Sequence, residues 1–168
     1  MNYKSGLKIF AFFLIAFLGI ILRDTIFNKL SIAGGKPDFV LILTVFYAIF
    51  NGYKKGAAMG MSLGLLEDFM VGRFIGVNII CKGFIGVIFG SLQRSLYKDN
   101  FLVPLLCMLM ASLLNSFVYF FVSAAIGGSF YFGDMLRSAV PDALYSMCFA
   151  PFFYVIVYLM NRHKDETE

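Results

Sequence analysis

Three ionisable side chains lie inside apolar stretches of the sequence, where they could do chemistry. Glu67 and Asp68 are adjacent in GMSLGLLEDFMVGRFIGVN (residues 60–78), and Lys82 follows in the next apolar run. Such groups can relay protons or hold a polar substrate. Adjacent side chains on a helix point about 100° apart, so the two carboxylates are not expected to share a face or to act as an acid–base pair. We expect Asp68 to point into the fold and Glu67 to point outward.

Other residue patterns that catalysis would need are missing. The sequence contains no HExxH and no phosphate-binding loop. The single histidine, His163, lies in the charged C-terminal segment and is expected at the surface. The three cysteines are far apart, form no CxxC, and are expected to be small buried hydrophobic residues: Cys81, Cys107 and Cys148. The pattern therefore disfavours an enzyme, a metal site or a bound cofactor.

The composition indicates the solvent in which these residues must be positioned. The chain is 60% hydrophobic and only 14% charged, with a mean hydropathy of +0.83, whereas soluble domains carry about 25% charged residues. This predicts an integral protein of the lipid bilayer. The net charge of +4 does not indicate nucleic-acid binding, because the basic residues occur in ones and twos between apolar runs.

The apolar runs predict an all-α integral membrane protein, a bundle of six transmembrane helices in a single domain. The expected spans are approximately residues 7–22, 37–53, 56–71, 74–92, 101–126 and 135–160. The second span is short, so it needs residues 51–53, a thin bilayer or burial within the bundle. Pro37 and Pro141 are expected in the first turns of their helices, where the missing N–H costs nothing.

Lys and Arg residues predict the orientation, because they are more frequent in cytoplasmic loops. With the N-terminus inside, eight of them fall on the inner side: Lys4, Lys8, Lys54, Lys55, Arg94, Lys98, Arg162 and Lys164. Five fall on the outer side: Arg23, Lys29, Lys36, Arg73 and Arg137. We therefore expect both termini to be cytoplasmic.

Glycines recur every four residues along the third expected helix and beyond it. The series is Gly52, Gly56, Gly60 and Gly64, then Asp68 in the same spacing, then Gly72 and Gly76. Residues four apart share a helix face, and glycines there let another helix approach closely. The face could pack against the fourth helix, which has Gly86 and Gly90, or receive the helix of a partner protein. We favour internal packing.

The short connection between the third and fourth helices makes them antiparallel neighbours. Asp68 is then expected to contact Asn78 or Lys82, which lie four residues apart on one face. Lys82 can pair within the bundle or extend its ammonium to the membrane surface, and the sequence leaves both open. Asn115 and Ser116, midway along the fifth helix, are expected to form hydrogen bonds between helices.

Two stretches resemble one known family. KPDFVLIL (residues 36–43) opens the second span, and GLLEDFMVGRFIGVN (residues 64–78) ends the third. Both resemble the rod shape-determining protein MreD family, with the family's motif positions occupied by Pro37, Asp38, Gly64, Asp68, Gly72 and Gly76. Glu67 falls at a variable position of that motif, so Asp68 is the carboxylate that the resemblance singles out.

The resemblance implies a non-enzymatic protein of the bacterial inner membrane, in the machinery that inserts lateral-wall peptidoglycan during cell elongation. The implied partners are MreC directly and, through MreC, MreB filaments and the RodA–transpeptidase synthase. MreD is thought to be similar in fold to the S-components of energy-coupling factor vitamin transporters, so a substrate-binding S-component is the alternative. The first helix, with Ala11 and Ala16 five apart, lacks the small residues four apart with which such components dock their motor.

The glycine spacing and the family resemblance lead to two expectations and one further alternative. Asp68 should hold the turn between the third and fourth helices. The glycine face should receive a helix of MreC, so that bulky residues at Gly56 and Gly60 would reduce copurification. A proton-coupled carrier would instead require Asp68 for transport.

Overall fold

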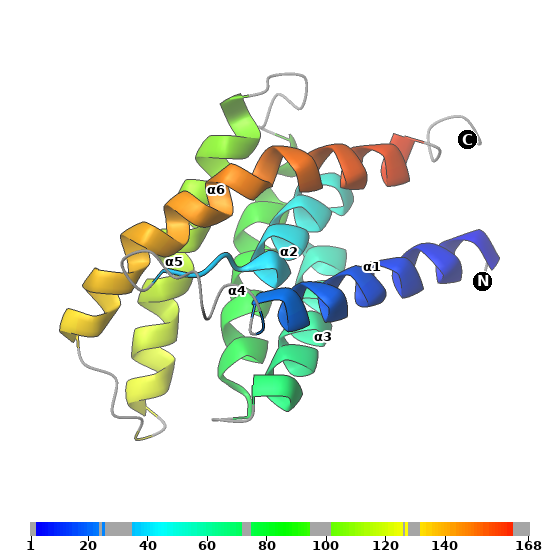
Figure 1. The fold of residues 1–168 in the computed structure, drawn as a ribbon. Coiled ribbons are helices and arrows are strands. Elements are labelled where there is room, and N and C mark those ends of the chain that lie inside the picture. The colour runs from blue at the N-terminus through cyan, green and yellow to red at the C-terminus, as the bar shows by residue number, and fades with distance from the viewer. Residues whose placement is uncertain are drawn as a thin grey trace.

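The fold is described here from a computed structural model, which describes residues 3–23, 25, 35–71, 75–94, 102–125, 127 and 132–162. Within these ranges the chain forms six α-helices and one short 3-10 helix (Figure 1): α1 (Tyr3–Leu22), α2 (Phe39–Asn51), α3 (Tyr53–Val71), α4 (Val77–Ser91), η2 (Leu92–Arg94), α5 (Leu102–Ala125) and α6 (Phe132–Arg162). The prediction of an all-α chain with six helices is confirmed for this part of the sequence. Gly72, Arg73 and His163 lie outside the described residues.

Helix α2 forms the centre of the molecule and packs against each of the other α-helices. It is apolar all round (FVLILTVFYAIFN), and such a helix is stable only when it is buried. Residues 39–46 are all buried, so burial within the bundle accounts for its short length. Asp38 caps its N-terminus by accepting a hydrogen bond from the Leu41 N–H at 2.9 Å. Pro37 therefore precedes the cap, and its predicted place in the first turn is wrong.

Helices α3 and α4 form an antiparallel pair. A Cβ on Gly56 would meet the Gly86 carbonyl, and a Cβ on Gly64 would meet the Asn78 carbonyl. Residue numbers thus rise along one helix as they fall along the other, as expected from the short connection. Gly76, with φ of 112°, stands at the N-cap of α4, a backbone conformation that glycine adopts without strain.

Helices α1, α5 and α6 lie around this centre (Figure 1). Helix α6 contacts α5 and α2, and its Phe153 ring lies 5.6 Å from that of Phe39. The expectation that Pro141 opens the sixth helix is wrong, because α6 begins at Phe132 and contains both Pro141 and Pro151. Cys81 and Cys107 are buried, but Cys148 is exposed on α6, which corrects its predicted burial.

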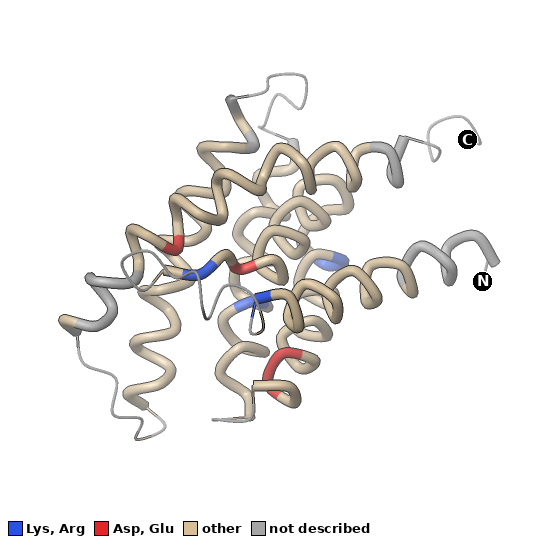
Figure 2. The backbone as a smooth tube through the Cα atoms, in the orientation of Figure 1, with Lys and Arg blue, Asp and Glu red and all other residues tan. Residues whose placement is uncertain are grey.

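The outer helices carry the longest apolar stretches. By length and composition, two described stretches could cross a membrane: Leu105–Ala125, with mean hydropathy 2.1, and Ala139–Tyr158, with mean hydropathy 1.5. Shorter apolar helices occupy Phe10–Leu22, Phe39–Asn51 and Val77–Ser91. Figure 2 shows that few of the described residues are Lys, Arg, Asp or Glu. The six spans and their orientation stay predictions.

Candidate functional site

Lys82 of α4 is the centre of a buried ion cluster, formed with Asp38, Glu67 and Arg23. Its ammonium forms an ion pair with Glu67 Oε2, lies 3.2 Å from Asp38 Oδ2, and donates to Asn78 Oδ1 at 3.3 Å. An ammonium has three N–H donors, and each has an acceptor here. Of the two possibilities left open for Lys82, pairing within the bundle is the one observed, and the side chain is fully buried.

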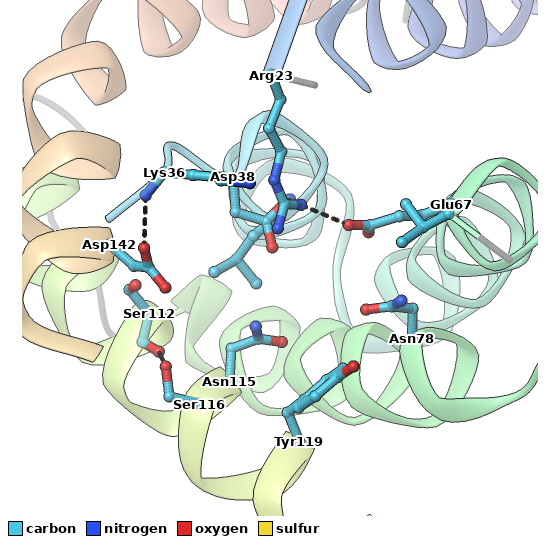
Figure 3. Close-up of a pocket in the computed structure, with 12 residues that line it drawn as sticks. Arg23, Lys36, Asp38, Glu67, Asn78, Ser112, Asn115, Ser116, Tyr119 and Asp142 are labelled. Atoms are coloured by element: carbon cyan, nitrogen blue, oxygen red, sulfur yellow. Dashed lines mark hydrogen bonds and ion pairs between the residues drawn. The ribbon is translucent and has the colours of Figure 1, made fainter. Parts of the chain in front are cut away.

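Glu67 is buried as deeply as Asp68, so the prediction that it points outward is wrong. Arg23, directly after α1, donates from Nη1 to Glu67 Oε1 at 2.7 Å (Figure 3). The buried stripe of α3 has three- and four-residue steps: Gly56, Met59, Gly60, Leu63, Gly64, Glu67 and Asp68. Such a stripe is about 100° wide or more and includes adjacent residues, so both carboxylates lie within it.

Asp68 holds the N-terminus of α4. Its Oδ2 accepts hydrogen bonds from the N–H groups of Gly76 at 2.8 Å and Ile79 at 3.3 Å. Its Oδ1 accepts from the Asn78 N–H at 3.2 Å and from the Asn78 side-chain amide at 2.9 Å. The first N–H groups of a helix have no partner within the helix, and a carboxylate there also interacts favourably with the helix dipole. The expected contact between Asp68 and Asn78 is confirmed.

The glycine face of α3 is covered from within the molecule. Gly56, Gly60 and Gly64 are buried. A Cβ on Gly60 would meet the Lys82 carbonyl, and a Cβ on Gly56 would lie 2.5 Å from Ala48 Cβ of α2. The face is therefore occupied by α4 and α2. It is not available to a partner's helix, which corrects the expectation of MreC docking at Gly56 and Gly60. Gly52 ends α2 with φ of 85°.

The segment before α2 fastens the cluster to α6. The Asp38 N–H donates to Ser146 Oγ at 3.1 Å, and the Lys36 N–H donates to Asp142 Oδ1 at 2.6 Å (Figure 3). Because Asp38 also contacts Lys82, a continuous chain of polar contacts runs from α6 through the start of α2 to α4. These contacts satisfy backbone N–H groups that precede α2.

A polar cavity of about 200 Å³ lies beside the ion cluster. Figure 3 shows the lining side chains around it, among them Arg23, Glu67, Asn115 and Asp142. Its charged lining residues are Arg23, Lys36, Asp38, Glu67 and Asp142. Helix α5 contributes four uncharged polar side chains: Ser112, Asn115, Ser116 and Tyr119.

The prediction that Asn115 and Ser116 form hydrogen bonds between helices is wrong. Ser116 Oγ donates to the Ser112 carbonyl of its own helix at 3.1 Å. Asn115 Oδ1 is buried, and none of the described residues donates a hydrogen bond to it. Both residues face the cavity instead of a neighbouring helix.

The ion cluster is suited to positioning helices. Each charge is held by at least one opposite charge, and the lysine has no donor left for a reacting group. Among the described residues, no three His, Cys, Asp or Glu side chains are grouped to hold a metal ion. Sequence reasoning missed Arg23, which it placed in an outer loop, and it missed Asp142 and Ser146. The polar residues of the otherwise apolar sixth segment were the only available signal for the last two.

Comparison with known proteins gives one match. Residues 5–164 match the profile of the family described as rod shape-determining protein MreD. No curated protein and no solved structure matches the chain, so the expected likeness to transporter S-components stays a prediction. The matched range contains every residue of the ion cluster and of the cavity lining.

Proposed function

This chain belongs to the MreD family of rod shape-determining proteins, and we propose on that premise that it is a non-enzymatic membrane scaffold of the cell-elongation machinery. It binds MreC directly. Through MreC it acts with MreB filaments and the RodA–transpeptidase synthase in lateral peptidoglycan synthesis. The observation that carries this proposal is the family match, which extends over 160 of 168 residues (from 5 to 164).

The distribution of charge supports a scaffold. The buried charges of α3 and α4 are engaged with one another, with Asp38 and Arg23, or with the N-terminus of α4. Large apolar side chains are exposed on the outside of the bundle, on α3 and α4 as well as on the outer helices, among them Phe69, Phe84, Phe10, Leu14, Leu106 and Phe117. A fixed centre with an apolar exterior suits a protein that acts through contacts with lipid and with other membrane helices.

The internal position of the glycine face changes where the partner can bind. A helix of MreC cannot lie against Gly56 or Gly60 without displacing α4 or α2. We therefore propose that MreC lies against an outer apolar face, while Asp68 and the glycines act from inside by keeping α3 and α4 together. The carrier alternative and the S-component alternative gain no support from these contacts.

The experiment is depletion of the protein in its host, combined with copurification of MreC from the same genome. Depletion should turn rods into rounded cells, and MreC should copurify with the tagged chain in mild detergent. A tagged membrane protein of similar size, expressed at the same level, controls for non-specific capture. Rods that keep their width after depletion, together with no enrichment of MreC over the control, would contradict the proposal.

A Lys82→Met variant separates binding from folding in this experiment. It removes the centre of the ion cluster, so its abundance in the membrane should fall. Loss of rod shape with this variant then reports loss of folded protein. An outer-face variant such as Leu14→Ala should keep its abundance, so a loss of MreC copurification there reports contact with the partner.

A further inference from the structure

The polar cavity contains an acceptor that the fold does not satisfy. Asn115 Oδ1 is buried, and none of the described residues donates a hydrogen bond to it. Buried side-chain oxygens in folded proteins nearly always have a donor, from the protein, from ordered water or from a ligand. Asn115 lies on the cavity wall, so a molecule in the cavity that carries an N–H or O–H group can donate to it.

A second acceptor and two cations line the same cavity. Asp142 accepts the Lys36 N–H through Oδ1, and its carboxylate lines the cavity together with Arg23 and Lys36. The acceptors Asn115 and Asp142 come from α5 and α6, whereas the two cations come from the chain that follows α1 and precedes α2. An occupant that contacts both groups needs hydrogen-bond donors as well as an anionic group.

Charge and size limit the occupant further. Three carboxylates line the cavity, those of Asp38, Glu67 and Asp142, and they are balanced by Arg23, Lys36 and the Lys82 ammonium that pairs with two of them. A balanced site favours an occupant without net charge. The volume of about 200 Å³ is below the roughly 300–1,000 Å³ of pockets for drug-sized ligands, so only a small group fits.

We propose that this cavity binds a small zwitterion, in which a primary ammonium lies a few atoms from an anionic phosphate. The ammonium donates to Asn115 Oδ1 and the Asp142 carboxylate, and the phosphate lies toward Arg23 and Lys36. This chemistry occurs in the headgroup of phosphatidylethanolamine and in free glycerophosphoethanolamine, whose phosphodiesters each carry one negative charge. The site is separate from partner binding and goes beyond the proposed scaffold function.

The test compares headgroups that differ only in their N–H donors. The purified, delipidated full chain is offered phosphatidylethanolamine or phosphatidylcholine with the same acyl chains, and retention is measured by native mass spectrometry. Choline carries no N–H, so we expect at least tenfold tighter retention of phosphatidylethanolamine. Phosphatidylglycerol, which has the phosphate but no ammonium, should be retained no better than phosphatidylcholine. Equal retention of all three would overturn the proposal and leave the cavity as a site for water.

Titration with soluble glycerophosphoethanolamine and glycerophosphocholine identifies the source of the ligand. Saturable calorimetric binding of glycerophosphoethanolamine alone means that the free headgroup suffices. Preference for the intact lipid without binding of the soluble compound means that the ligand is a membrane lipid. Both results support the site, whereas saturable binding of both soluble compounds with equal affinity contradicts a role for the ammonium donors.

Substitutions at Asn115 test the acceptor itself. Asn115→Leu removes the oxygen and should abolish the preference for phosphatidylethanolamine, a loss of at least tenfold. Asn115→Asp keeps an acceptor in the same place and should retain the preference for phosphatidylethanolamine. This variant tests the acceptor even if Asn115→Leu does not fold. Asn51→Leu is the matched control, because the Asn51 amide donates to the Tyr47 carbonyl of its own helix, away from the cavity. An undiminished preference in a folded Asn115→Leu protein would overturn the proposal.

Discussion

The inner helices α2, α3 and α4 and the outer helices α1, α5 and α6 satisfy their polar groups in different ways. In the inner helices, every hydrogen-bonding group of the Lys82 ammonium and of the Asp68 carboxylate has a partner. In the outer helices, Asn115 Oδ1 has no donor among the described residues.

This contrast shows where the molecule is rigid and where space is left. Glycine lets the backbones of α3 and α4 touch, which leaves no room between them. The cavity lies where α5 and α6 meet the inner helices. Buried charge is stable only where its partners are supplied, so we expect the inner helices to be sensitive to substitution and the outer faces to be tolerant.

The largest expected effect is that of Lys82→Met. The substitution leaves Glu67 and Asp38 buried without their shared cation, and breaking a buried ion pair from one side costs about 3–5 kcal/mol. The free energy of unfolding should fall by that amount, measured by denaturation in detergent. Lys55→Met, at an exposed position of the same helix pair, should leave it unchanged. Equal effects of the two substitutions would mean that the ion cluster does not stabilise the inner helices.

Gly60→Ala should have the next largest effect. The new Cβ would clash with the Lys82 carbonyl, and overpacking of this kind costs about 1–3 kcal/mol. The matched control is Gly133→Ala in α6, where nothing described lies within 4 Å of the added Cβ. There the replacement should stabilise the helix, because glycine is up to about 1 kcal/mol less favourable than alanine in a helix. Melting temperatures that shift in the same direction for both would contradict close contact of α3 with α4.

Asp68→Asn should cost less, about 1–2 kcal/mol. The amide keeps one acceptor oxygen but loses the charge and the second acceptor, while the N–H groups of Gly76, Asn78 and Ile79 all need one. Asp142→Asn in α6 should cost less again, because Asp142 accepts one such hydrogen bond, from the Lys36 N–H. Thermal unfolding of the two variants side by side checks the order, and a larger effect at Asp142 would reverse the comparison between the inner and outer helices.

Much of the inner region could be predicted from local sequence. Glycines at four-residue spacing and a short connection predict the α3–α4 pair, because both features act between neighbouring segments of the chain. The same reasoning located the contact of Asp68 with Asn78. The burial of Glu67 does not follow from the same reasoning. Adjacent residues point about 100° apart, which predicts that only one of the two carboxylates is buried, but the buried stripe of α3 is wide enough for both.

The cavity and the ion cluster needed tertiary information. Arg23 lies 44 positions from Glu67, and Asp38 lies 108 positions from Ser146. No spacing rule connects residues so far apart, and an arginine after an apolar run is read as a loop residue. Pro141 gave a misleading signal, because a proline inside a helix is tolerated where neighbouring groups satisfy the freed backbone.

The smallest expected effect lies on the outer face of α5, where an exposed leucine can be compared with a buried leucine of α2. Leu106 is 61% exposed, so Leu106→Ala should change the free energy of unfolding by no more than about 0.5 kcal/mol. Leu41→Ala, at a fully buried position of α2, should cost about 2–5 kcal/mol. A change of more than 1 kcal/mol at Leu106 in the purified chain would mean that this face packs against a second copy. A normal stability combined with reduced MreC copurification would instead mean that the partner covers it.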